Sequence, residues 1–387
     1  MAFFGNDRVN WLNLHYAINA LARSGGDAFF CAFLLQKGFP IPTTLAALAA
    51  ILAGRFLVRP AVLPLAIRFG LRPLLIVGSV LVGAQYPMLA MVTSVGPWLY
   101  ALVAVSAVAD AIYWTCYHAY FASLGDEAHR GHQIGAREAI AALTGVVGPL
   151  ATGWCLNVFG PMVAFGATGV VLAASALPLL RTPDAAVARE RAPGAARTLL
   201  RGAWFFAVDG WIGAGSYTLW QIALFITLHQ SYTAFGGALA LAALVGAISG
   251  MALGRWIDRG HGRRAVGVAL GLSAAVMTFR AAAFGHPALA VIGSAAGAVG
   301  AALYIPTLMT AVYNQAKLSP CPFRFHMAAE GGYDVGCAAG CLAAAALLWG
   351  GAPMSGVLLA PLAGLAAMSI MLSRYYRLRG SLAPAVP

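Results

Sequence analysis

The stretch at residues 254–264 reads GRWIDRGHGRR, and it joins two apolar runs that are each long enough to cross a membrane. The first run covers residues 235–257 and the second covers residues 265–284. A hydrocarbon core about 30 Å thick needs roughly 20 mostly apolar residues per helix, because every backbone N–H and C=O must be bonded within its own segment. A short basic turn between two such runs therefore indicates a pair of membrane-spanning helices.

The same alternation of apolar runs and short turns extends over all 387 residues. The chain is 61% hydrophobic and 9% charged, whereas a soluble globular domain has roughly 25% charged residues. The runs are long and show no strand-type alternation, which excludes an outer-membrane barrel. We predict an all-α membrane protein with twelve transmembrane helices, at residues 11–36, 43–66, 73–93, 97–122, 133–157, 162–181, 203–228, 235–257, 265–284, 288–315, 324–349 and 354–374.

Landmarks in the first half of the chain recur in the second half at one spacing. Arg68 and Arg259 are 259 − 68 = 191 residues apart, and Gly148 and Gly340 are 340 − 148 = 192 apart, as are Glu138 and Glu330. Six spans per half is an even number, so both halves enter the membrane the same way and form parallel repeats. The predicted division is a six-helix half at 1–181, a cytoplasmic linker at 182–202, a second six-helix half at 203–374 and a cytoplasmic tail at 375–387.

The net charge of +12 comes from basic residues in alternate connections between the apolar runs. This distribution follows the positive-inside rule and predicts that both termini are cytoplasmic. It does not form a soluble basic patch, so we expect no nucleic-acid partner. The preference for arginine over lysine is typical of a GC-rich bacterial genome, and we expect a multi-pass protein of the cytoplasmic (inner) membrane, in contact with the lipid bilayer.

Three connection and span motifs resemble those of the major facilitator superfamily. The stretch at 254–264 resembles the superfamily's signature loop, with one extra residue. Its first-half counterpart at 63–75 keeps Arg68, Gly70 and Arg72 but has Ile67 in place of the usual aspartate. The fifth span resembles the antiporter motif of the superfamily, with threonine in two glycine positions, and its helix-packing residues are Gly145, Gly148, Pro149 and Gly153.

The resemblance implies the twelve-helix fold of the superfamily and a substrate cavity lined by spans one, four, seven and ten. It implies alternating-access transport of a small solute, with protons as the candidate coupling ion and export favoured over import. Import of a small organic solute or metal chelate by proton symport is the alternative. The residues expected to line the cavity or to take part in coupling are Arg23, Asp27, Asp110, Tyr113, Trp114, Tyr117, His118, Tyr217, Trp220, Gln221, Tyr304, Asn314 and Asp334.

Several of these residues also stand out without the resemblance, because each charge at mid-helix costs roughly 2.5–3.5 kcal/mol on an insertion scale. Arg23 and Asp27 are four residues apart and can pair on one face of a helix. Asp110, Trp114, Tyr117 and His118 share one stripe of the fourth span. Asp27, Asp110 and Asp334 are the candidate proton carriers.

Charged residues at the cytoplasmic ends of the helices are candidates for a gate that closes in one conformation and opens in the other. An ordinary juxtamembrane cluster that only fixes topology is the alternative interpretation. The gate candidates are Arg68, Arg137, Glu138, Asp258, Arg259 and Glu330.

Other functional classes find less support in the sequence. No H-E-x-x-H, G-x-S-x-G or P-loop pattern occurs, and the six cysteines show no paired spacing for a metal or a disulfide framework. We therefore expect no enzyme, no catalytic residues, no cofactor and no bound metal, and a monomer. A non-transporting receptor or assembly factor, or an intramembrane enzyme, is the alternative of another class.

Overall fold

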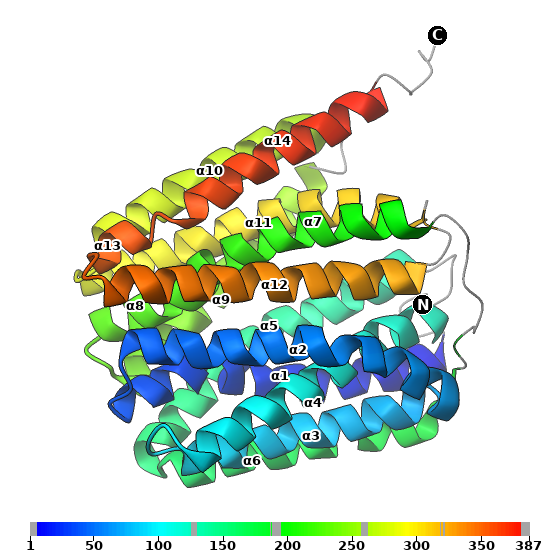
Figure 1. Cartoon of the computed structure of the whole chain (residues 1–387), viewed down its shortest axis with the longest axis horizontal. Coiled ribbons are helices and arrows are strands. Elements are labelled where there is room, and N and C mark those ends of the chain that lie inside the picture. Colours follow the sequence, from blue (N-terminus) through cyan, green and yellow to red (C-terminus); the bar gives the residue numbers. More distant parts are fainter. Residues whose placement is uncertain are drawn as a thin grey trace. The chain divides into compact units, whose positions relative to one another are not determined.

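The computed structural model describes residues 6–124, 130–185, 187, 195–256, 262–317, 319 and 322–380. These residues form helices and connecting turns, with no strand among them (Figure 1). The chain divides into two compact units, which are considered one at a time: unit 1 is residues 1–191 with 228–244, and unit 2 is residues 192–227 with 245–387.

Unit 1 contains the first six long helices and the beginning of α9. Its helices are α1 (Asp7–Gln36), α2 (Ile41–Phe69), α3 (Leu71–Met91), α4 (Pro97–Leu124), α5 (Arg130–Val158) and α6 (Pro161–Ala174), and a 3₁₀ segment at Leu177–Arg181 extends α6. Pro40 precedes α2 and Gly160 precedes Pro161 of α6, so these helices start where the sequence places a proline or a glycine.

Unit 2 contains the remaining helices. They are α7 (Ala195–Gly213), a π-helical segment at Ala214–Leu219, α8 (Trp220–Thr227), the later part of α9 (Tyr232–Trp256), α10 (Gly262–Ala283), α11 (Pro287–Lys317), α12 (Pro322–Trp349), α13 (Met354–Val357) and α14 (Pro361–Gly380). The π-helical segment continues α7 directly into α8, so the three elements form one span.

Ten helices in the described part of the chain are long and apolar enough to cross a membrane. The other two of the twelve predicted spans are also helical, but they differ in composition or continuity. α1 carries several polar and charged residues, and the seventh span is divided by its π-helical segment. The prediction of an all-α membrane protein with twelve transmembrane helices is confirmed.

The pattern of helix packing repeats between the units, each considered by itself. In unit 1, α1 packs against α5, and α3 packs against both α4 and α6. In unit 2, α7 packs against α12, and α10 packs against both α11 and α14. Counted as spans, the pairs in unit 1 are one with five, three with four and three with six. The pairs in unit 2 are seven with eleven, nine with ten and nine with twelve, which are the same pairs shifted by six spans.

Glycines allow the equivalent helix pairs to approach closely. In unit 1, a Cβ atom added at Gly148 would lie 2.6 Å from the carbonyl oxygen of Leu21 in α1, and one at Gly25 would lie 2.8 Å from the carbonyl of Gly148. In unit 2, a Cβ at Gly340 of α12 would lie 2.6 Å from the Cβ of Ala214. Gly148 and Gly340, which the sequence pairs by their spacing, thus lie at corresponding contacts. Such small-residue contacts are typical of membrane helix packing.

Two helices extend further than the apolar runs that predict them. α7 already begins at Ala195, inside the segment expected to be linker, and α14 continues to Gly380, beyond the expected end at residue 374. Both extensions are rich in arginine, which has a good helix propensity and is solvated outside the hydrocarbon. Hydropathy marks where a helix leaves the membrane and not where the helix ends.

The close contact between α1 and α5 gives a first prediction. Gly148→Ala places a methyl group against the α1 backbone, and we expect overpacking to cost about 1–3 kcal/mol of unfolding free energy. Gly166→Ala in α6 is the matched control, because nothing lies within 4 Å of a Cβ at Gly166. Thermal unfolding of the two purified variants in detergent measures the difference. A Gly148→Ala protein as stable as the control would contradict the contact.

Candidate functional site

Polar residues recur along one side of α1 in the interior of unit 1. His15, Asn19, Arg23 and Asp27 follow one another at four-residue spacing, which places neighbours one turn apart on the helix. His15, Asn19 and Arg23 are buried, whereas the side chain of Asp27 is 46% exposed. This polar side of α1 is the core of the candidate site.

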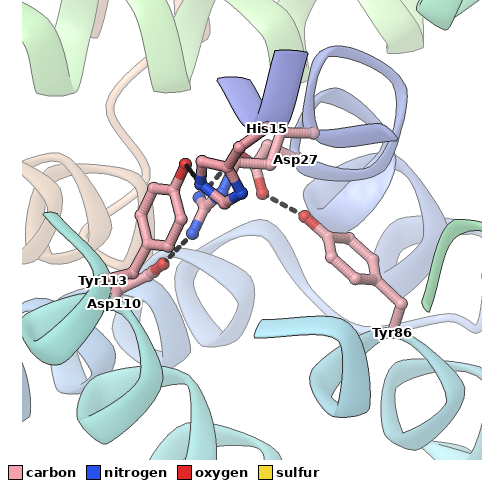
Figure 2. Close-up of polar contacts among 6 residues, drawn as sticks. His15, Asp27, Tyr86, Asp110 and Tyr113 are labelled. Atoms are coloured by element: carbon pink, nitrogen blue, oxygen red, sulfur yellow. Dashed lines mark hydrogen bonds and ion pairs between the residues drawn. The ribbon is translucent and has the colours of Figure 1, made fainter. Parts of the chain in front are cut away.

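Arg23 joins two carboxylates from different helices. Its Nη1 donates to Oδ2 of Asp27 at 3.2 Å, and its Nη2 donates to Oδ1 of Asp110 in α4. The side chains of Arg23 and Asp110 are 9% and 13% exposed. The predicted Arg23–Asp27 pair is therefore present, and Asp110 adds a second, deeper partner (Figure 2).

Two aromatic rings of α4 lie close to the Arg23 guanidinium. Its Cζ lies 5.1 Å from the ring centre of Tyr113 and 5.3 Å from that of Trp114. Cation–π contacts of this kind stabilise a guanidinium that has lost its water. Arg23 is thus held by two carboxylates and two rings, which explains how it is accommodated within a spanning helix.

Asp27 has a second partner on α3. The hydroxyl of Tyr86 donates to Oδ1 of Asp27, so the two oxygens of this carboxylate have different donors (Figure 2). A Cβ at Gly26 would lie 2.7 Å from Cζ of Tyr86, so only glycine at this position leaves room for the ring. Tyr86 was not among the predicted site residues, because nothing in its local sequence distinguishes it from a packing tyrosine.

Two arginines of α2 also belong to this cluster, and the sequence-based prediction missed both. Arg59 is 2% exposed and donates from Nη1 to Oγ1 of Thr115 in α4 at 3.1 Å. Arg55 is half-buried one turn earlier, and both arginines interact electrostatically with Asp110. The signal was present in the sequence, since two arginines four residues apart inside a long apolar run need buried partners.

Three of the charged groups lie at one depth. Arg23 is 36 − 23 = 13 residues from the end of α1, Arg55 is 55 − 41 = 14 from the start of α2, and Asp110 is 110 − 97 = 13 from the start of α4. These helix ends lie on the same side of the membrane, because successive spans alternate in direction. At 1.5 Å per residue each group is about 20 Å from that end, which is deep within the hydrocarbon.

His15 extends the hydrogen-bond network beyond Arg23. Its Nδ1 lies 2.6 Å from the carbonyl oxygen of Ser175, and its Nε2 lies 3.3 Å from the hydroxyl of Tyr113. A carbonyl only accepts, so Nδ1 carries a proton, and Nε2 accepts from the Tyr113 hydroxyl when the ring is neutral. This histidine was also missed, because a lone histidine in an apolar helix is indistinguishable from a core residue.

The predicted aromatic stripe of α4 divides into buried and accessible members. Tyr113 and Tyr117 are fully buried, with parallel rings 5.9 Å apart. Trp114 and His118 are half-buried, and their rings stack at 5.6 Å. Among the predicted aromatic residues and histidine of this stripe, only Trp114 and His118 have partly accessible rings in this structure.

Two of the predicted residues of unit 2, Tyr304 and Trp220, contact charged side chains of neighbouring helices. The hydroxyl of Tyr304 in α11 donates to Oδ1 of Asp209 in α7 at 2.8 Å. Arg280 of α10 donates to the carbonyls of Ser216 and Gly293 at 2.7 and 3.0 Å and lies 4.7 Å from the ring of Trp220. Ser216 belongs to the π-helical segment, so Arg280 provides a hydrogen-bond donor to a backbone carbonyl of that segment.

The other predicted residues of unit 2 differ in their burial. Tyr217 is 59% exposed, Gln221 and Asn314 are half-buried, and Asp334 is completely buried. Among the residues that the structure describes, no group of three or more His, Cys, Asp or Glu side chains could hold a metal ion.

Of the gate candidates, the structure describes the side chains of Arg68 and Glu330. Arg68 is exposed, with its guanidinium 5.2 Å from the ring of Phe69, and Glu330 is half-buried. Asp258 and Arg259 lie outside the described residues. Arg137 and Glu138 lie in α5, but their side chains are outside the described part. The gate stays a prediction.

Asp184 lies at the turn between α2 and α3, next to Gly70. Its Oδ1 accepts from the backbone N–H of Arg72 at 3.0 Å, in the first turn of α3, while Arg72 donates to the carbonyl of Thr182 at 2.8 Å. Gly70 has a φ of 85° and no side chain with which to cap α3. Asp184, 112 positions after Arg72, therefore supplies the cap.

This cap gives a second prediction. Asp184→Ala removes the acceptor for the first turn of α3 and should lower the unfolding free energy by about 1 kcal/mol. Asp184→Asn keeps an acceptor oxygen and should lose less. Thermal unfolding of both variants in detergent compares them. Equal stability of Asp184→Ala and the unmodified protein would show that the cap contributes nothing.

Comparison with known proteins identifies the family. The model of the Major Facilitator Superfamily matches residues 14–320. The chain belongs to this superfamily. No curated protein matches it in sequence.

Solved structures of superfamily type share the fold over nearly the whole chain. The POT family transporter PepTSo has 12% identity and a TM-score of 0.73, with 97% of this chain and 99% of that chain covered. The human organic anion transporter TETRAN has 15% identity, a TM-score of 0.68 and coverage of 95% and 98%. A mutant of the nucleoside transporter NupG has 12% identity, a TM-score of 0.70 and coverage of 96% and 100%. At these identities the likeness shows the fold alone.

Proposed function

We propose that this superfamily transporter couples the movement of a small organic solute to protons, with Asp27 as the proton-carrying group. The observation that supports this is the position of Arg23 between two carboxylates of unequal exposure. Asp110 is nearly buried against Arg23, whereas the Asp27 side chain is 46% exposed. A mid-span carboxylate facing lipid would be costly, so Asp27 faces a water-filled space from which protons arrive.

Protonation of Asp27 would change the partners of Arg23. A proton on Oδ2 of Asp27 occupies the oxygen that accepts from Nη1, at a present distance of 3.2 Å, and removes the negative charge. The Nη2 bond to Asp110 remains, so the guanidinium keeps one counter-charge in its buried environment. Arg23 then has a donor to offer elsewhere, and a group with two sets of partners can bias a conformational equilibrium.

The direction of transport is the second part of the proposal. The antiporter-like glycine pattern of α5, in which Gly148 meets α1 beside Gly25, favours export. Proton symport in the import direction is the second candidate, because protonation of Asp27 frees a donor on Arg23 for the substrate. We further propose that the protein is a monomer in the cytoplasmic membrane. The basic connections support an orientation with both termini in the cytoplasm.

The coupling is tested by proton flux in proteoliposomes under a panel of solutes. We expect Asp27→Asn to reduce solute-driven proton flux by on the order of tenfold or more, because an amide cannot carry the proton. A tenfold change corresponds to about 1.4 kcal/mol. The same variant should retain solute exchange across the membrane without a proton gradient. Asp7→Asn, at the exposed start of α1, is the matched control.

Two results would contradict this assignment. Undiminished proton flux in Asp27→Asn would exclude Asp27 as the carrier. Solute transport without proton flux in the unmodified protein would exclude proton coupling and leave a uniporter or a transporter coupled to another ion. The direction of proton movement relative to the solute distinguishes antiport from symport.

A further inference from the structure

Asp209 of α7 is a carboxylate within a span of unit 2, and its hydrogen-bond partner is uncharged. The hydroxyl of Tyr304 donates to Oδ1 of Asp209 at 2.8 Å. Tyr304 is 304 − 287 = 17 residues from the start of α11 and 317 − 304 = 13 from its end. At 1.5 Å per residue the pair is about 20 Å from the nearer end of α11. Asp209 therefore lies at a depth where an ionised carboxylate is costly.

No cationic side chain in the described part of unit 2 pairs with Asp209 or acts on it electrostatically. Arg280 of α10 donates instead to two backbone carbonyls, one in α11 and one in the π-helical segment. In unit 1, by contrast, Arg23 forms ion pairs with both of its carboxylate partners. Asp209 is thus a carboxylate to which the described residues of its own unit supply no counter-charge.

The second oxygen of Asp209 is available to a ligand. No hydrogen bond to Oδ2 occurs among the described residues, and Oδ2 is not a fully buried atom. The residue as a whole is half-buried. A carboxylate facing lipid at this depth would be costly, so the accessible part of Asp209 faces a water-filled space. Asp209 is therefore within reach of a solute in that space, whereas Asp334 of α12 is completely buried.

Aromatic and apolar side chains surround this part of α7. Phe205, one turn before Asp209, and Tyr304 both belong to the apolar core cluster of unit 2. One turn after Asp209, a Cβ atom at Gly213 would lie 2.8 Å from the hydroxyl oxygen of Tyr333, which is half-buried. Residues four apart lie on one face of a helix, so Asp209 has aromatic residues one turn away in both directions. Aromatic rings attract cations and pack against apolar bodies.

The donor set suits an organic cation better than a metal ion. Ca²⁺ and Mg²⁺ take about six or more oxygen ligands. Among the residues that the structure describes, no group of three or more His, Cys, Asp or Glu side chains could hold a metal ion. An ammonium group needs a single carboxylate as its counter-charge, and its apolar body gains from contact with aromatic side chains.

We propose that Asp209 is a substrate-binding residue for an organic monocation, an amine or quaternary ammonium ion with an aromatic or apolar body. Oδ2 of Asp209 binds the cationic group, while Tyr304 holds Oδ1 in place. This inference rests on the proposed transport function and names its substrate class. Asp209 neutralises the substrate in unit 2 and Asp27 carries the proton in unit 1, which fits the exchange of a cation for a proton.

The test compares molecules of similar shape that differ in charge. Purified protein in detergent is titrated with benzylamine, phenethylamine and benzyltrimethylammonium while its unfolding temperature is measured. Benzyl alcohol and phenethyl alcohol are the neutral counterparts, and benzoate and phenylacetate are the anionic ones. We expect at least one of the three cations to raise the unfolding temperature in a saturable way. The alcohols and carboxylates should have no comparable effect.

Variants of Asp209 test the assigned residue. Asp209→Asn should raise the amine concentration needed for half-maximal stabilisation on the order of tenfold or more, as for loss of a hydrogen bond to a charged group. Asp209→Glu keeps the charge, so its effect should be smaller. Asp7→Asn, at the exposed start of α1, is the control for general loss of negative charge. Elution as a single species by size exclusion shows that a variant is folded.

The outcomes separate this inference from the proposed function. Equal stabilisation by the alcohols or carboxylates, no stabilisation by any of the three cations, or unchanged cation binding in Asp209→Asn would overturn the cation assignment. Proton-coupled transport of another solute would still stand in each of these cases. Saturable cation binding that depends on Asp209, in a protein that moves no solute into proteoliposomes, would support the cation site and contradict transport.

Discussion

An arginine placed in hydrocarbon must be given its counter-charges by the protein, and this constraint organises the interior of unit 1. Arg23 is surrounded by Asp27, Asp110 and the rings of Tyr113 and Trp114, which come from two helices. Tyr86 on a third helix holds the far oxygen of Asp27. The guanidinium therefore links α1 to α4, and Asp27 links α1 to α3, so a change at Asp27 leaves the Arg23–Asp110 contact in place.

Close helix contacts make this arrangement geometrically possible. Gly26 leaves room for Tyr86 to reach Asp27, and Gly25 allows α1 to lie against α5 at Gly148. Side chains at these positions would separate the helices and lengthen the hydrogen bonds that the cluster needs. The same segment of α1 contains glycines that allow close helix packing and charged residues that form the Arg23 cluster. These residues explain why the hydropathy of α1 is low.

Much of the fold follows from the sequence, because hydrocarbon thickness and backbone hydrogen bonding fix the length of each span. The pairing of Arg23 with Asp27 is likewise a local consequence of four-residue spacing. The contributions of Tyr86, His15 and Asp184 depend on which helices pack together, and no local pattern contains that information. Arg55 and Arg59 were detectable, since their spacing and apolar surroundings match those of Arg23 and Asp27.

Asp110 is the main partner of Arg23 in this structure. A double-mutant cycle with Arg23→Gln, Asp110→Asn and the combined variant, read as unfolding free energy in detergent, tests it most directly. Breaking a buried pair from either side costs about 3–5 kcal/mol, so each single variant should be strongly destabilised and the combined variant should lose much less than the sum. Additive losses would show that the two residues do not stabilise each other and would contradict the account.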